Sequence, residues 1–352
     1  MTVHPQLRNP NAVLISRTPV GEPVTWTDFH RAAVQVLTAM RIGLEGEHVV
    51  LKPNLSSGEA FADPDTGITT HPGFVQGMIE YLQAHGMDAG RSCILEDPRN
   101  SDDDEPRHWK GTGFPEVAQA TGVGLRTPTT TTCVGKTVPR PHAFAALNVS
   151  RLAVSPDTIL FNVPKLRTHP LNITTLCLKN LMGTVNAPDR HFCGQAWQEF
   201  PPEVRDDRRP RREWVDESLH ERWQAGLARR LVDLAQVVPS PVNVVEGVVG
   251  REGTGFRRGL NRTMGLAVAG TNPVAVDSVA SYLMGFDPAG LLYLRLAAQA
   301  GLGSNDLGAL TVFEVRDGVV VPCTDLAALR ADPPFRVIRE IRGEEEWIPP
   351  EA

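Results

Sequence analysis

The chain has 352 residues, of which 41% are apolar and 22% charged, and these values are typical of a globular protein with a full core. The formal net charge of −6 argues against a general nucleic-acid binder, and no apolar run is long enough to span a membrane. The polar first residues lack the charged-then-apolar pattern of a signal peptide, so we expect a cytoplasmic protein.

Short apolar runs alternate with stretches of helical spacing along the whole chain. In the first half, strands are predicted at 13–16, 49–51, 93–95 and 158–163, and helices at 27–40, 74–84 and 171–182. In the second half, helices are predicted at 223–238, 273–284 and 291–300, and strands at 242–246, 265–269 and 310–315. Strand–helix–strand succession indicates an α/β fold with a mainly parallel, doubly wound sheet, and two similar lobes would fit the pattern.

A stretch rich in Pro, Arg and Asp divides the predicted elements into two groups. We expect an N-terminal α/β lobe at 10–183, an insertion or lid at 184–222, and a C-terminal α/β lobe at 223–345. We expect the insertion to set substrate choice.

Three predicted helices are preceded by the same local pattern. Thr70-His71-Pro72, Thr168-His169-Pro170 and Thr271-Asn272-Pro273 each place a proline where the first helical residue should be. This predicts His71, His169 and Asn272 at or beside helix N-caps, where free N–H groups suit an anion and a histidine favours its neutral form. The simpler interpretation is that Thr-x-Pro is merely a good helix start.

Two lysines follow predicted strands, in Leu51-Lys52-Pro53-Asn54 and in Val163-Pro164-Lys165-Leu166. Ligands of doubly wound sheets bind beyond the carboxyl ends of the strands, so these lysines should converge with the histidines there. Glu96, Asp97 and Glu246 also end predicted strands and would supply carboxylates for general acid–base work.

Lys179 lies in a mostly apolar predicted helix, where a lysine is costly unless it is paired or functional. It would act as a base, or it would form a structural pair with Glu246 or Asp277. The glycine-rich stretch 247–259 contains Arg251, Arg257 and Arg258, and either wraps an anion or forms a plain hairpin.

Several blocks of the sequence, in the same order, resemble those of the family known as domain of unknown function 362. They are Lys52-Pro53-Asn54-Leu55, Thr69-Thr70-His71-Pro72, Lys165-Leu166-Arg167-Thr168-His169, Lys179-Asn180-Leu181-Met182-Gly183, Glu246-Gly247, the run 269–277 and the run 283–288. The resemblance covers about residues 48–306 and implies an α/β fold. Some members belong to biosynthetic pathways, and many carry a ferredoxin-like segment and are labelled iron–sulfur proteins.

The cysteines depart from that family pattern. None of Cys93, Cys133, Cys177, Cys193 and Cys323 forms a C-x-x-C pair. Because such clusters need closely spaced thiolates, we expect no iron–sulfur cluster. The sequence does not identify a cofactor, although its residues are compatible with a divalent metal.

The combined prediction is an enzyme that acts on a small anionic metabolite by general acid–base chemistry, namely isomerisation, elimination or cyclisation. Assistance by a metal and a place in a secondary-metabolite pathway are both compatible with the sequence. The alternative is a metal- or redox-centre-binding protein without turnover. The predicted catalytic residues are His169, Lys165, Lys179, His71 and Glu246. The predicted substrate-binding residues are Lys52, Asn54, Asn180, Arg257 and Asn272, and the predicted metal ligands are His71, His169 and Asp277. Nucleic-acid and membrane partners are not expected, and a homo-oligomer is compatible with the sequence.

Overall fold

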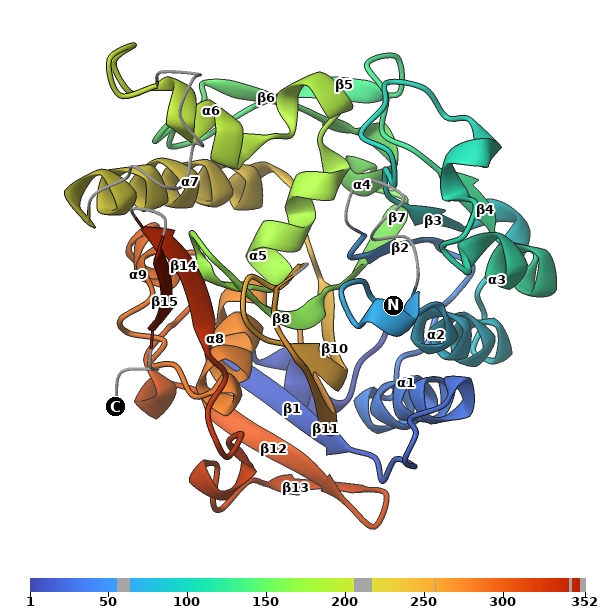
Figure 1. The fold of residues 1–352 in the computed structure, drawn as a ribbon. Coiled ribbons are helices and arrows are strands. Elements are labelled where there is room, and N and C mark those ends of the chain that lie inside the picture. Colours follow the sequence, from blue (N-terminus) through green and yellow to red (C-terminus); the bar gives the residue numbers. More distant parts are fainter. Residues whose placement is uncertain (56–63, 206–216, 257, 342–343, 349–352) are drawn as a thin grey trace.

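A computed structural model of the chain describes residues 1–55, 64–205, 217–256, 258–341 and 344–348. Eleven strands form one sheet with the order β13-β12-β1-β11-β10-β7-β2-β3-β4, and β8 and β9 extend from β10 (Figure 1). These strands are β1 (Ala12–Arg17), β2 (His48–Pro53), β3 (Cys93–Leu95), β4 (Gly124–Arg126), β7 (Thr158–Val163), β8 (Lys165–His169), β9 (Ile173–Thr175), β10 (Val242–Arg251), β11 (Asn261–Gly270), β12 (Thr311–Arg316) and β13 (Val319–Pro322).

Most strand pairs in this sheet are parallel. The central run β10, β7, β2, β3 and β4 is parallel throughout, and β12 is parallel to β1. Antiparallel pairs occur where β11 joins β1 and β10, and at the β12–β13 and β8–β9 hairpins. Two further hairpins lie outside the main sheet: β5 (Cys133–Thr137) with β6 (Ala146–Ser150), and β14 (Val337–Ile341) with β15 (Glu344–Ile348).

Helices cover both faces of the main sheet (Figure 1). Alternate residues of β1 point to opposite faces: Val13 and Ile15 join the core beneath α7, α8 and α9, whereas Leu14 joins the core beneath α1, α2 and α3. The helices are α1 (Trp26–Met40), α2 (Pro72–Ala84), α3 (Phe114–Thr121), α4 (Arg151–Val154), α5 (Cys177–Asn180), α6 (Phe192–Gln198), α7 (Glu217–Val237), α8 (Pro273–Met284) and α9 (Leu292–Gln299). The prediction of a doubly wound α/β fold with a mainly parallel sheet is confirmed.

Strands of the two predicted lobes hydrogen-bond to one another within this sheet. β1 lies between β11 and β12, and β7 pairs with β10, so segments from both ends of the chain share one layer. The boundaries at 10–183, 184–222 and 223–345 remain a prediction. No helix in the described ranges is both long and apolar enough to cross a membrane.

Two of the three predicted helix starts are present. His71 is the N-cap of α2 and accepts a hydrogen bond from Gly73 N at 3.0 Å. Asn272 is the N-cap of α8 and accepts from Val274 N and Ala275 N. Both side chains satisfy N–H groups that the first helical turn leaves without partners.

The helix predicted at 171–182 is wrong over its first half. Residues 173–175 form β9, which pairs with β8 so that His169 lies opposite Ile173, and only Cys177–Asn180 is α-helical. The β-branched run Ile173-Thr174-Thr175 favours this short hairpin. The side chain of His169 closes its turn by accepting from Leu171 N and Asn172 N, each at 3.1 Å.

Candidate functional site

A cavity of about 280 Å³ lies beyond the carboxyl ends of β2 and β3 and beside β8. This is the edge of the sheet at which a doubly wound fold binds its ligands. Its lining comprises Asn54, Leu55, Glu96, Asp97, Arg167, His169, Thr175, Lys179, Asn180, Met182, Gly183, Arg190, His191, Cys193 and Phe256. Of the predicted site residues, the structure thus brings His169, Lys179, Asn54 and Asn180 together.

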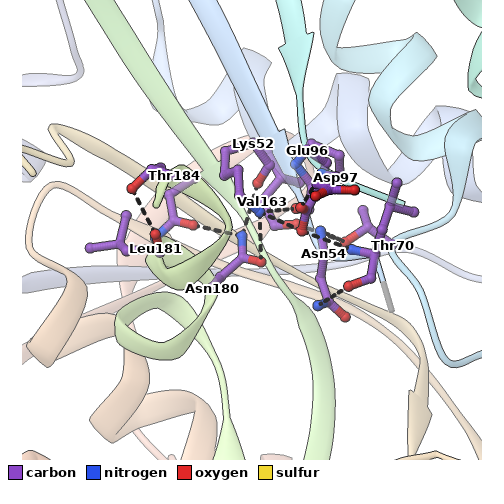
Figure 2. Close-up of polar contacts among 12 residues, drawn as sticks. Lys52, Asn54, Thr70, Glu96, Asp97, Val163, Asn180, Leu181 and Thr184 are labelled. Carbon is purple, nitrogen blue, oxygen red and sulfur yellow. Dashed lines mark hydrogen bonds and ion pairs between the residues drawn. The ribbon is translucent and has the colours of Figure 1, made fainter. Parts of the chain in front are cut away.

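Lys52 lies beneath this cavity and is paired within the protein. Figure 2 shows it between Glu96 and Asn180: its Nζ is 2.7 Å from Glu96 Oε1 and 3.4 Å from Asn180 Oδ1. Burial lowers the pKa of Lys52, and the adjacent Glu96 carboxylate opposes that shift. The side chain is fully buried and neutralised by Glu96, and the role of Lys52 as an anion ligand remains a prediction.

Glu96 is held rigidly at the cavity wall. Besides Lys52, it accepts hydrogen bonds from Leu55 N at 3.3 Å and from Asp97 N at 2.7 Å. Gly183 packs against the same pair, and a Cβ at that position would collide with the end of the Lys52 side chain and with Glu96 Oε2. Glycine leaves room for this ion pair, and this is a packing reason for Gly183 at the end of the block Lys179–Gly183.

Buried amides continue this network into the sheet. Asn180 Nδ2 donates to Lys52 O at 2.9 Å and to Asn162 Oδ1 at 2.8 Å, and Asn162 Nδ2 donates to Asn243 Oδ1 at 3.0 Å. Asn180 therefore lines the cavity while its amide is committed to the protein. Both donors of the amide are already used within the protein, and its predicted contact with substrate remains a prediction.

A second buried cluster comprises Lys165, Glu246 and His71. Lys165 Nζ lies 2.6 Å from Glu246 Oε2, and the same carboxylate accepts from His71 N at 3.3 Å and from Val248 N at 2.9 Å. The imidazole of His71 stacks on Phe29 with ring centroids 3.8 Å apart, and burial and the Lys165 charge lower its pKa to about 3.

None of these three residues lines the cavity. The structure thus places them apart from His169, with Lys165 paired to Glu246 and His71 capping α2, and their catalytic roles remain a prediction.

Two arginines form a cationic wall around the cavity. Arg167, in β8, lies over the ring of Phe256 at 4.6 Å and donates to Ile68 O at 3.1 Å. Burial lowers its pKa to about 9, against the attraction of Glu96, so it stays charged at neutral pH. Arg190 Nη2 contacts Asp97 Oδ2 at 2.6 Å and Asn100 Oδ1 at 2.7 Å, whereas its buried Nη1 has no hydrogen-bond partner among the described residues.

Lys179 lines the cavity as a lysine with no partner in the described part of the chain. It is half-buried, and it makes no hydrogen bond or ion pair with any residue that the structure describes. Burial lowers its pKa, Arg167 lowers it further, and nearby Cys193 opposes the shift. The predicted alternative of a structural pair is wrong, because Glu246 binds Lys165 and Asp277 accepts from Cys177 N and Leu178 N at the start of α5.

His169 completes the polar lining. Its Nδ1 is occupied as an acceptor by two backbone N–H groups, so the neutral ring carries its proton on Nε2. The ring meets Phe256 edge to face with centroids 5.9 Å apart. His169 thus lies at the wall of a cationic cavity with its Nδ1 held as a hydrogen-bond acceptor.

The other predicted site residues lie elsewhere. Asn272 uses its side chain to cap α8 and to donate to Leu302 O at 2.7 Å. It does not line the cavity, and its substrate contact remains a prediction. Arg257 lies outside the described residues.

Residues of the predicted insertion supply one wall of the cavity, and Arg190 among them was missed by sequence reasoning, which had weighed His191 and Cys193 as a ligand or substrate contact against a plain surface loop. Arg190, His191 and Cys193 line the cavity, and the indole of Trp223 anchors this segment by donating to Cys193 O at 2.7 Å. Arg167 was also missed as a site residue, although alternation along β8 places it on the same face as His169. That alternation was the available signal for Arg167.

The residues predicted as ligands of a metal or an iron–sulfur cluster do not lie together in the described parts of the chain. No three His, Cys, Asp or Glu side chains there could hold a metal ion, so His71, His169 and Asp277 are not a ligand set. All five cysteines are described, and they are free and dispersed. The iron–sulfur cluster that the family resemblance implies requires grouped thiolates, so these residues do not fit it.

Comparisons with known proteins agree with the sequence blocks. A thylakoid-associated protein of Synechocystis sp. is 26% identical over 268 residues, which cover 76% of this chain and 72% of that protein. No solved structure matches. The model of the family described as domain of unknown function (DUF362) matches residues 49–282, which include the cavity-lining residues from 54 to 256. The chain therefore belongs to the DUF362 family, as the order of its sequence blocks indicated.

Proposed function

We propose that the protein is an enzyme that binds a small anionic metabolite in the cavity between β8 and α6 and moves a proton on it. The observation that carries this proposal is Lys179, a lysine beside two buried arginines that has no hydrogen-bond or ion-pair partner among the residues the structure describes. Buried charge without a counter-charge is costly, and an anionic ligand would supply the missing partner.

The cavity residues divide into binding and proton-transfer groups. Arg167 and Arg190 would hold the anion and stabilise negative charge that develops next to it. Lys179 would attract the anion as its ammonium form and, because burial and Arg167 lower its pKa, would lose that proton and then act as the base. His169 would give a proton from Nε2, because its Nδ1 is held as an acceptor.

Such a base and acid on one anion suit isomerisation, elimination or cyclisation. Lys179 would remove a proton from a carbon next to the anionic group, and the electron pair would form a new double bond. His169 would then protonate a second position or a leaving group. A cytoplasmic location and a place in a secondary-metabolite pathway belong to the same proposal.

Solvent deuterium incorporation tests this proposal without knowledge of the full reaction. The protein is incubated in deuterium oxide with a library of small carboxylates and phosphate esters, and the mass gain of each compound is measured. We expect at least one compound to gain deuterium at the wild-type protein, and Lys179→Met to reduce the rate by about 100-fold or more, because a general base contributes about 10²–10⁴.

Lys110→Met is the matched control, since Lys110 is exposed and does not line the cavity. It should exchange at the wild-type rate. The proposal would be contradicted if the wild-type protein exchanged no compound of the library faster than buffer does. It would also be contradicted if a folded Lys179→Met protein exchanged at the full wild-type rate.

A further inference from the structure

The segment that carries the proposed base is a helix of only four residues. α5 continues directly into a 3₁₀ turn at Leu181–Thr184, and this stretch supplies one wall of the cavity. The lining residues that it contributes are Lys179, Asn180, Met182 and Gly183. So short a helix is not stable by itself, because its few hydrogen bonds do not offset the cost of nucleation. The position of Lys179 therefore depends on contacts between α5 and the rest of the protein.

Asp277, in α8, holds the first turn of α5. Its Oδ1 accepts a hydrogen bond from Cys177 N at 2.7 Å, and its Oδ2 accepts one from Leu178 N at 3.0 Å. Leu176 is the N-cap residue of α5, and its side chain makes no capping hydrogen bond because it has no acceptor. Asp277 thus replaces the N-cap side chain from a position 100 residues further along the chain.

A second buried side chain fixes the same turn from the sheet. Asn162 Nδ2 donates to Cys177 O at 3.0 Å, and Asn162 Oδ1 accepts from Asn180 Nδ2 at 2.8 Å. Asn162 therefore ties α5 to β7, whereas Asp277 ties it to α8. Because Lys179 follows Cys177 by two residues, both anchors act on the backbone from which the lysine side chain extends.

The carboxylate of Asp277 is completely buried, which is unfavourable for a charged group. Burial raises its pKa to about 7, although the hydrogen bonds from Leu178 and Cys177 lower it. The neighbouring Cys177 and Tyr293 stay neutral, because burial raises the pKa of both. Asp277 forms no ion pair with any residue in the described ranges. An apolar side chain would fill this core without that cost, so stability alone does not account for an aspartate here.

We propose that Asp277 is a positioning residue, which fixes α5 so that the amine of Lys179 lies next to the anion bound in the cavity. This inference rests on the proposed function, since it concerns the placement of the proposed base. Arg167, on β8, and Arg190, which follows a 3₁₀ turn at Ala187–Asp189, belong to other segments. Loss of the Asp277 contacts should therefore impair proton removal more than binding of the anion.

Asp277→Asn tests this role in the deuterium-incorporation assay, with the most active compound of the library. The assay is run at about pH 8, where the wild-type carboxylate is mostly ionised. Asparagine keeps one acceptor, so either Cys177 N or Leu178 N loses its partner. We expect kcat to fall by about 10–100-fold, because a displacement of about 1 Å has effects of this size, and KM to change by less than about threefold.

Ser278→Ala is the matched control within the same helix. Ser278 is as buried as Asp277, and its hydroxyl donates to Val274 O and Ser304 O, neither of which belongs to α5. The variant removes buried hydrogen bonds without touching α5, so kcat and KM should stay at their wild-type values. Asp277→Ser keeps a single hydroxyl acceptor and should lower kcat in the same way. It decides the test if thermal melting shows that Asp277→Asn is unfolded.

Amide hydrogen exchange of the peptide 176–184 needs no substrate, so it separates this inference from the proposed function. In Asp277→Asn this peptide should exchange at least about fivefold faster than in the wild type and in Ser278→Ala, because a buried hydrogen bond is lost. Unchanged exchange of the peptide would overturn the inference. So would an unchanged kcat in folded Asp277→Asn, or an equal fall of kcat in Ser278→Ala.

Failure of the proposed function gives a different result. The wild-type protein would then incorporate deuterium into no compound of the library. Faster amide exchange confined to residues 176–184 of Asp277→Asn would still support the positioning of α5 by Asp277.

Discussion

Replacing Glu246 by glutamine should lower the free energy of unfolding by about 3–5 kcal/mol, the usual cost of removing one member of a buried ion pair. Glu246 and Lys165 are almost completely buried, and their charged atoms lie 2.6 Å apart. His71 N and Val248 N donate to different oxygens of Glu246, so glutamine keeps an acceptor for only one of them. The loss therefore reports the unpaired ammonium of Lys165 together with one lost backbone hydrogen bond. Urea unfolding measures it.

The double variant Lys165→Met/Glu246→Gln is the control for this prediction. Methionine removes the buried charge, so the double variant should recover much of the stability lost by Glu246→Gln alone. Recovery would identify the pair as a structural element of the sheet edge. A Glu246→Gln protein as stable as the wild type would contradict the buried pairing.

Acidification should destabilise the protein through His71, and His71→Asn should remove that contribution. The pKa of His71 is about 3 in the folded protein and 6.5 as its ordinary value, because the ring is buried on Phe29 near Lys165. Below pH 6.5 the unfolded chain takes up a proton that the folded chain refuses until about pH 3. Stability is therefore lost as the pH falls through this window, by about 3 kcal/mol at pH 4.

Asparagine at position 71 keeps an N-cap acceptor for Gly73 N but does not titrate. The difference in unfolding free energy between wild type and His71→Asn should thus narrow or reverse from pH 7 to pH 4. Parallel pH profiles for the two proteins would show that His71 is protonated equally easily in the folded and unfolded states.

The sequence was informative about local structure. Thr-x-Pro patterns predicted the N-caps at His71 and Asn272, since capping depends on neighbouring residues only. The order of apolar strands and amphipathic helices predicted the doubly wound sheet. At His169 the same pattern failed, because the β-branched residues 173–175 pair with β8 instead of starting a helix.

Contacts between distant segments could not be predicted. Lys52 and Lys165 have similar strand-end contexts, yet one is paired with Glu96 beneath the cavity and the other with Glu246 in a separate cluster. These partners depend on strand order, which places β7 between β2 and β10. Arg190 was missed for the same reason, since it reaches Asp97 across 93 residues of sequence.

The reactivity of Cys193 reports directly on whether the cavity is positively charged and open to small anions. This half-buried cysteine lines the cavity near Lys179. Burial raises the pKa of Cys93 to about 12 and of Cys133 to about 11, and it also raises the pKa of Cys177 and Cys323. Because thiolates are the reactive species, these four cysteines should be alkylated slowly.

The measurement is the rate of alkylation of Cys193 by iodoacetate and by iodoacetamide at low salt, followed by peptide mass spectrometry. Positive charge attracts the anionic reagent, so the iodoacetate-to-iodoacetamide rate ratio should exceed that of free glutathione by about tenfold. In Lys179→Met the ratio should fall toward that of glutathione. A wild-type ratio equal to or below that of glutathione would contradict the existence of a cationic cavity that admits small anions.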